Sequence, residues 1–284
     1  MSQWDEDPTK RAFQDGSRYH LPKDQPEHER LDTQSASLAA IMNNRPLHAA
    51  PSNPKRILDI GCGTGAITAL LATTYPNAHV IGVDLAPVPE SRHGKHPNLE
   101  YVQANVVDLI GQDPRFEPES FDYIFERLLV MGVSDWPGHV SSVSRLLKPG
   151  GYLELHEIDM DLLAPDEKPL KMEWYDAFLQ DTRASSLDMQ IGRKLPALLR
   201  SAPFENVQDF QYPFPPKPVE GQPQFDGMAG QLSAMFPLMI TKVCGAQRGA
   251  EKAQEVVADF RRTYDPGFEP GTHWIMWVIV GQKK

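Results

Sequence analysis

The sequence predicts a doubly wound α/β fold, and two observations lead to this expectation. Short apolar runs alternate with helical segments between residues 55 and 158, and the glycine-rich stretch ILDIGCGTGA, residues 57–66, joins the first run to the helix after it. Strands separated by helices form right-handed crossover units, which place parallel strands in one sheet with helices on both faces. We also expect an N-terminal helical cap and a helical insertion after the fifth strand.

The first half of the chain supplies most of these elements. Apolar residues recur at helical spacing over residues 26–42, which predicts a helix, and the Pro-Ser-Asn-Pro stretch at 51–54 then interrupts the chain. Strands are expected at residues 55–60, 78–85, 99–106, 121–130 and 151–158. Helices are expected at residues 66–75 and within 134–151, where Pro-Gly-Gly ends the second one.

The second half is expected to be mostly helical. Residues 163–200 read as helical, the proline-rich segment 212–218 as a loop or edge segment, and residues 273–284 as a last strand. A methionine-rich apolar stretch at 228–240 precedes a charged helix. We therefore divide the chain into a cap at 1–50 and one domain at 51–284, with helical segments at about 163–200 and 225–262 that would cover a substrate.

Composition limits the classes of function. The 284 residues are 40% hydrophobic and 23% charged, and they contain no apolar run long enough to span a membrane. The polar, acidic N-terminus lacks the apolar core of a signal peptide, so we expect a cytoplasmic protein and leave the nucleus open. The excess of 38 acidic over 28 basic residues argues against nucleic-acid binding.

The cysteines do not indicate a metal centre. Cys62 and Cys244 are too few for a disulfide framework, and neither belongs to a cluster with zinc-ligand spacing. Cys62 lies between two glycines, where a small packed side chain is more plausible than a reactive one. We therefore expect no metal.

The glycine loop predicts a nucleoside site. Gly61, Gly63 and Ala66 satisfy the dinucleotide pattern G-x-G-x-x-A, and Asp84 ends the next strand nineteen residues beyond Gly65. Glycines allow the backbone to turn tightly and approach a ligand, and an acid at the end of the second strand accepts hydrogen bonds from ribose hydroxyls. These features alone do not select the cofactor.

Asp59 selects it. A dinucleotide places its negative pyrophosphate against the glycine loop, where a nearby carboxylate would repel it. S-adenosylmethionine carries no phosphate, and its sulfonium and amino groups are positive. A carboxylate two positions before Gly61 therefore favours S-adenosylmethionine over a nicotinamide cofactor.

The pattern D-x-G-x-G-x-G, the acid ending the next strand and the later LLKPGGYLEL resemble class I S-adenosylmethionine-dependent methyltransferases over roughly residues 55–160. The resemblance implies a Rossmann-like, seven-stranded sheet. Asn105 would meet the adenine amino group, and the end of the fourth strand would face the cofactor and the acceptor. The cofactor-binding positions expected in this domain are Asp59, Gly61, Cys62, Gly63, Gly65, Asp84, Leu85, Asn105, Val106, Glu126 and Arg127. For Arg127, a surface salt bridge is the alternative.

A finer resemblance covers the N-terminus. SRYHLPKDQPEHERLDTQSASL, with the later LHAAP and SDWP, is similar to a fungal branch of methyltransferases of secondary metabolism, which includes tailoring enzymes and a regulator-like subgroup. The branch implies that Tyr19, Arg30 and Gln34 cap the cofactor pocket, and Arg30 could pair with the methionine carboxylate. The alternative for Arg30 is a helix-surface charge. Ser35 replaces the usual histidine of the branch, so no role of that histidine is carried over.

The catalytic and acceptor-binding residues are less specified. His156 is the best-placed candidate base near the end of the fifth strand, with a packed, hydrogen-bonded histidine as the alternative. Seven aromatic and methionine residues could line an apolar acceptor pocket, although simple helix packing is the alternative for each. They are Trp174, Tyr175, Phe178, Met228, Met235, Phe236 and Met239.

Three functions remain open from the sequence. The first is methyl transfer to O, N or S of a small, apolar natural product, giving S-adenosylhomocysteine. The second is a methyltransferase-like regulator that binds a protein partner, as in the regulator-like subgroup. The third is an enzyme that binds the cofactor but catalyses a cyclisation without methyl transfer. The chain is expected to be a monomer or a homodimer.

Overall fold

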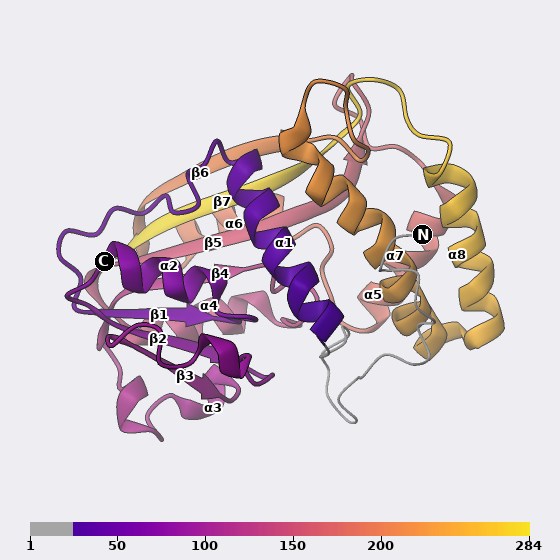
Figure 1. Cartoon of the computed structure of the whole chain (residues 1–284). Helices are drawn as coiled ribbons and strands as arrows, with labels where there is room; N and C mark the ends of the chain where they lie inside the picture. The colour runs from indigo at the N-terminus through magenta and orange to yellow at the C-terminus, as the bar shows by residue number, and fades with distance from the viewer. Residues whose placement is uncertain (1–24) are drawn as a thin grey trace.

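A computed structural model describes residues 25–284, and its strands form one seven-stranded sheet in the order β3-β2-β1-β4-β5-β7-β6 (Figure 1). Strands β1 to β5 are parallel, and β7 runs antiparallel to both β5 and β6. The expected doubly wound, Rossmann-like α/β fold is thus confirmed. The strands are β1 Arg56–Ile60, β2 His79–Asp84, β3 Leu99–Gln103, β4 Phe121–Arg127, β5 Leu147–Leu163, β6 Phe204–Phe214 and β7 His273–Lys283.

Eight α-helices accompany the sheet in the described part of the chain. They are α1 Gln25–Ile41, α2 Ala66–Thr74, α3 Val106–Leu109, α4 Trp136–Leu146, α5 Glu173–Ala184, α6 Leu195–Ser201, α7 Asp226–Arg248 and α8 Ala250–Tyr264. None of them combines the length and the apolar character needed to cross a membrane.

The central strands are buried because helices cover both faces of the sheet. In β1, Ile57 to Ile60 are all buried, as the short apolar run predicts for a strand inside a parallel sheet. The apolar side of α2 packs in one hydrophobic cluster with β1 and β2, and α4 and α6 pack in a second cluster on the β4 and β5 side. Asp135 caps α4 by accepting a hydrogen bond from the backbone N–H of Gly138.

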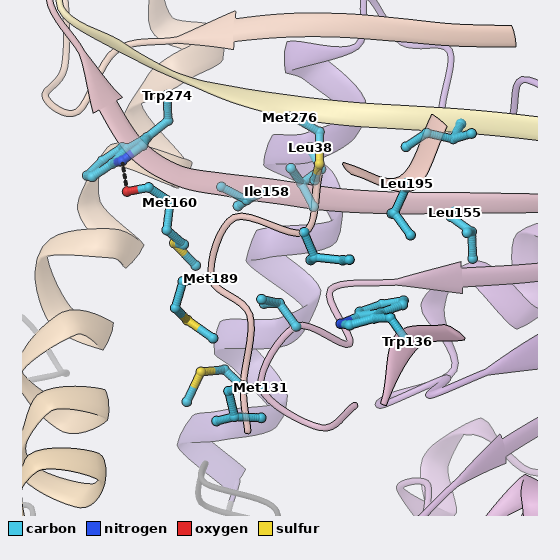
Figure 2. Close-up of a cluster of buried hydrophobic side chains, with 14 of the residues drawn as sticks. Leu38, Met131, Trp136, Leu155, Ile158, Met160, Met189, Leu195, Trp274 and Met276 are labelled. Atoms are coloured by element: carbon cyan, nitrogen blue, oxygen red, sulfur yellow. Dashed lines mark hydrogen bonds between the residues drawn. The ribbon is translucent and has the colours of Figure 1, made fainter. Parts of the chain in front are cut away.

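A helical layer adjoins the strands. Figure 1 shows α5, α7 and α8 gathered beside the sheet, with α1 between them and α2. Trp174, Phe236 and Phe260 contact one another edge-to-face or tilted inside this layer. Figure 2 shows how β5 and β7 join the same buried core, where the indole N–H of Trp274 donates to the carbonyl of Met160 at 3.2 Å. Burial of these large apolar surfaces holds the layer against the sheet.

Several expected elements differ from the structure. The strand expected at 151–158 extends over Leu147–Leu163, so the segment 163–200 is helical only in α5, α6 and the short 3₁₀ turn Gly192–Lys194. The proline-rich segment 212–218 contributes the end of β6, an edge strand whose residues 204–211 have no strand pattern in the sequence. Most β6 side chains are exposed or half-buried, which removes the apolar alternation by which a strand is recognised.

Candidate functional site

A cavity of about 570 Å³ opens where β1, β2 and β4 end. This is the place where a doubly wound sheet binds its ligand. The cavity is lined by the glycine loop, by the loop that follows β4, and by residues of α1, α3, α4, β5 and α7. It brings together most of the expected cofactor-binding residues, namely Arg30, Gln34, Asp59, Gly61, Cys62, Gly63, Asp84, Leu85, Asn105, Val106 and Arg127.

The glycine loop has the backbone conformation that its residues predict. Gly61, Gly63 and Gly65 all have positive φ, which side chains other than glycine rarely adopt. A Cβ at Gly65 would also collide with the ring of Tyr101 on β3. The loop therefore closes tightly over the end of β1 and leaves its backbone accessible to the cavity.

Asp84 lies at the end of β2 beside an apolar platform. Its carboxylate accepts a hydrogen bond from the backbone N–H of Gly63 at 2.8 Å, which holds it against the glycine loop. Leu85 and Val107 line the cavity and are each 41% exposed, although they are large and apolar. Asn105 caps α3 by accepting from the N–H of Val107. A carboxylate next to exposed apolar side chains suits a ribose and its attached flat base.

Asp59 is a buried carboxylate in the wall of the cavity. Its side chain accepts a hydrogen bond from the hydroxyl of Thr68 at 2.6 Å. Burial raises the pKa of Asp59 to about 7, and the hydrogen bond from Thr68 and the charge of Arg127 oppose that rise. A cationic group of a ligand would favour the ionised form of this carboxyl.

Two guanidinium groups face the same cavity. Arg30 on α1 makes a buried, bidentate ion pair with Glu27, and its Nη1 has no hydrogen-bond partner among the described residues. Arg127 at the end of β4 donates from Nη2 to the hydroxyl of Ser35 at 2.9 Å, and its Nη1 also lacks a partner there. Unpaired buried donors indicate that a ligand supplies their acceptors.

Helix α1 covers the glycine loop. Thr64 donates from its hydroxyl to Asp32 at 2.6 Å, and the side chain of Leu31 lies over Gly63. Arg92 pairs with the same aspartate at 2.7 Å. Contacts of residues 31 and 32 thus attach helix α1 to the glycine loop. Arg30 and Gln34, which the N-terminal motif predicts at the cofactor pocket, line the cavity beside them.

The other part of the cavity is apolar and rich in methionine. Met235 and Met239 of α7 line it, together with Met131, Ile158 and Met160. Figure 2 shows the last three in one cluster of buried hydrophobic side chains. Of the seven expected acceptor-binding residues, only Met235 and Met239 line this cavity. The other five are buried in the core, where Trp174, Phe178 and Phe236 pack together and Tyr175 donates to Asp161.

The structure does not place His156 where a general base is needed. His156 is fully buried, its Nε2 lies 2.6 Å from Glu154 Oε1, and its ring packs against Phe125 on the α2 side of the sheet. Burial lowers the pKa of His156 although Glu154 opposes this effect. Its geometry corresponds to the alternative of a packed, hydrogen-bonded histidine, because a side chain outside the cavity cannot reach an acceptor there.

Glu154 joins that histidine to the segment before β1. Its carboxylate accepts hydrogen bonds from the backbone N–H groups of His48 and Ala49 and from the hydroxyl of Tyr123. Burial alone would raise the pKa of Glu154, but hydrogen bonds from His156 and His48 hold it at about 2. His48, Glu154 and His156 could in principle surround a metal ion, yet both oxygens of Glu154 already accept protein donors. We therefore assign this cluster to the stability of the fold.

Two other expected residues of the described part of the chain, Gly65 and Glu126, do not line the cavity. Tyr19 lies outside the described residues. Glu126 is 1% exposed and faces α4, where its carboxylate lies 2.9 Å from His139 Nε2. Cys62 lines the cavity, and burial raises the pKa of its thiol well above the usual range, which opposes a reactive role.

Sequence reasoning missed His139. This residue lies on α4, lines the cavity and is oriented by Glu126. Burial opposes protonation of His139, but the charge and hydrogen bond of Glu126 outweigh it and raise its pKa. The pair is thirteen residues apart in the sequence and bridges a strand and the following helix, so no local spacing could have indicated it.

The donors and acceptors of the cavity fit S-adenosylmethionine. Asp84 and the exposed Leu85 suit its adenosine, Asp59 suits its ammonium group, and an unpaired guanidinium suits its carboxylate.

Comparison with known proteins agrees with this geometry. A family model described as a methyltransferase domain matches residues 34–209. Methyltransferase str2 of Strobilurus tenacellus is 27% identical over 253 residues, which cover 88% of this chain and 87% of that protein. Secondary metabolism regulator laeA of Aspergillus flavus is 32% identical over 173 residues, but the match spans only 44% of its length and 58% of this chain.

Solved structures share the fold. Phosphoethanolamine N-methyltransferase 2 of Haemonchus contortus, in complex with S-adenosyl-L-methionine, aligns with a TM-score of 0.50 and 18% identity over 89% of this chain and 57% of that one. The YcgJ protein of Bacillus subtilis aligns with a TM-score of 0.51 and 23% identity over 88% of this chain and 98% of that one. At these identities the likeness concerns the fold.

Proposed function

The chain belongs to the methyltransferase domain family, and on this premise we propose that it transfers a methyl group from S-adenosylmethionine to O, N or S of a small apolar molecule of fungal secondary metabolism. The observation that carries the proposal is the cavity, in which a nucleoside-binding half continues into a methionine-lined half. One half suits the cofactor and the other suits an apolar acceptor.

The residues of the chain bind and orient rather than react. When bound, S-adenosylmethionine supplies an electrophilic methyl group on a sulfonium, which already carries its leaving group. Asp84 accepts from the ribose, and Asp59 balances the positive amino group. Helix α1 covers the glycine loop, and the methionine wall excludes water around the acceptor, which favours an in-line displacement.

A labelling experiment tests this proposal. The full chain is incubated with S-adenosylmethionine labelled at the methyl group and with fractions of apolar fungal extracts, and the products are separated and counted. We expect label to enter a small molecule while S-adenosylhomocysteine accumulates. A product formed without label would instead support the cyclisation alternative, and the absence of any cofactor-dependent product would contradict both.

A regulatory role is the second candidate, and the similarity to secondary metabolism regulators favours it. These relatives are 31–32% identical to the chain over 173 and 205 residues, which cover 58% and 67% of it. A pull-down from a native fungal extract distinguishes the two roles, because a regulator should retain a protein partner at stoichiometric amount and a tailoring enzyme should not.

A further inference from the structure

Arg127 is a charged group of the cavity to which the cofactor contacts proposed above give no partner. It ends β4, where its strand pairs with β1 on one side and with β5 on the other. Arg127 therefore lies between the strand that leads into the glycine loop and the strand that carries Ile158 and Met160. This is the boundary between the nucleoside half and the apolar half of the cavity.

The guanidinium of Arg127 has spare hydrogen-bonding capacity and no direct carboxylate partner. Ser35 takes one N–H from Nη2, and Nη1 is buried without a hydrogen-bond partner among the described residues. Asp59 acts on it only through charge. Arg127 is half-buried as a whole, but leaving its buried Nη1 without an acceptor is costly, which indicates that a bound anion completes the site.

The cofactor offers one negative charge to two arginines. Its amino acid tail carries a single carboxylate, whereas Arg30 and Arg127 each offer an unpaired Nη1. Arg30 lies on the helix that covers the glycine loop, next to Leu31 over Gly63. This position suits the tail of the cofactor. Arg127 remains for a second anion beside the apolar wall.

We propose that Arg127 binds a carboxylate of the methyl acceptor, so that the acceptor is an apolar acid. This inference rests on the proposed function, and it narrows the acceptor class from any apolar molecule to one with an apolar body and an anionic end. The body lies against Met131, Met160, Met235 and Met239. Arginine suits such a role because its planar donors match a carboxylate.

Calorimetry with matched pairs of probes tests the inference. The full chain is saturated with S-adenosylhomocysteine and titrated with benzoate, 2-naphthoate and 4-biphenylcarboxylate, and with the three corresponding neutral amides. Each amide has nearly the size of its acid and lacks only the charge. We expect at least one acid to bind tenfold or more tightly than its amide.

Variants of the arginines show which guanidinium causes the tighter binding of an acid than of its amide. Arg127→Gln should reduce the preference for the acid at least tenfold, and Arg127→Lys should retain part of it because the charge remains. Arg30→Gln should weaken binding of S-adenosylhomocysteine and leave the preference for the acid in place. Arg200→Gln, which removes an exposed arginine paired with Asp209, is the matched control. Thermal melting of each variant shows whether it folds.

The outcomes separate this inference from the proposed function. If the wild type fails to bind S-adenosylhomocysteine, the proposed function fails. If it binds S-adenosylhomocysteine but no acid, or binds acids and amides equally, only the inference about Arg127 is overturned. A loss of cofactor affinity in Arg127→Gln with an unchanged acid preference would likewise assign this arginine to the cofactor.

Discussion

Two acids of opposite environment determine the electrostatics of the site. Asp59 is buried, and its pKa is raised to about 7, whereas Glu154, also buried, has a pKa held at about 2. The difference follows from their partners, since Asp59 accepts a side-chain hydrogen bond from Thr68 and Glu154 accepts several hydrogen bonds. The carboxylate of Asp59 is thus available to a cationic ligand, whereas the carboxylate of Glu154 is already hydrogen-bonded within the protein and stabilises the fold.

Cofactor binding should therefore depend on pH through Asp59. The ammonium group of S-adenosylhomocysteine needs the ionised carboxylate, so below pH 7 the dissociation constant should rise by about tenfold for each pH unit. Asp59→Asn should weaken binding at pH 8 and abolish this dependence. Calorimetric titrations between pH 5.5 and 8 measure both effects, with Asp209→Asn on the edge strand as the control. Equal pH dependence in wild type and Asp59→Asn would contradict the assignment.

His156 should act on stability and not on catalysis. His156→Ala removes a fully buried ring and one donor to Glu154, and we expect it to lower the free energy of unfolding by about 2 to 4 kcal/mol. His156→Gln should recover part of this loss, since its amide can donate to Glu154. Urea denaturation measures the change. Slower methyl transfer by a fully stable His156→Ala protein would restore the histidine as a base.

At this scale, residues in local motifs could be predicted and residues in long-range pairs could not. Asp59, Asp84 and the glycines follow from a short segment whose spacing carries the chemistry. Arg127 was expected at the cleft from the family resemblance, which places the end of the fourth strand there. His156 was misplaced because β5 continues to Leu163, so His156 is buried in the middle of the strand rather than at the end that borders the cavity.

At the scale of elements, the connection between α1 and the sheet links the cap to the site. Residues 30 to 35 contact the glycine loop and Arg127, whereas His48 and Ala49 bind Glu154 on β5. The described part of the cap is therefore attached at two places, once through polar side chains at the cavity and once through a buried carboxylate.

We expect Glu154 to contribute strongly to the attachment of the cap to the sheet, and hence to the stability of the protein. Its folded pKa of about 2 lies below the ordinary value of 4.5, so its contribution is present above pH 4.5 and is lost as the pH falls toward 2. Glu154→Gln should lower the free energy of unfolding at pH 7 by about 3 kcal/mol. The gap between wild type and variant should shrink by about 1 kcal/mol at pH 3.5. Urea denaturation at both pH values tests this, with the exposed Glu205→Gln as control; a constant gap would contradict the role.

Helix α1 should become more protected when the cofactor binds. Its contacts with the glycine loop are few, namely the hydrogen bond between Thr64 and Asp32 and the side chain of Leu31 over Gly63, so its backbone should open locally in the free protein. A ligand beneath Leu31 should hold it closed. Hydrogen exchange of residues 27–41 with and without S-adenosylhomocysteine measures this effect. Helix α8, which does not line the cavity, is the internal control. Unchanged exchange in α1 with saturating ligand would contradict its role as a cover.

The elements differ in how well the sequence predicts them. Strands β1 to β5 and helix α2 are apolar, regularly spaced and flanked by turn residues, so their patterns are clear. Strand β6 is largely exposed and contains Pro213, and helix α7 contains Pro237, so both conflict with local propensity and depend on tertiary packing. Helices α5 and α6 were expected within 163–200, but the end of β5 was not.

At the scale of the whole molecule, the sheet and the helical layer form different parts of the cavity. The parallel strands place the cofactor-binding acids and glycines at one edge, and α7 adds the methionine wall against them. Helices α5 and α8 pack behind α7 and contribute no residue to the cavity, so changes there should act through the position of α7. This arrangement explains why cofactor residues were predictable and acceptor residues were not, since the wall depends on how distant helices pack.

The central claim is that this cavity binds S-adenosylmethionine and its product through the acids at the ends of β1 and β2. Calorimetric titration of the full chain with S-adenosylhomocysteine, beside Asp84→Ala, tests it most directly. We predict saturable one-to-one binding that Asp84→Ala weakens by about 1 to 3 kcal/mol, since a charge-assisted hydrogen-bond partner is lost. No saturable binding by the wild type, or equal affinity in a folded Asp84→Ala protein, would contradict the account.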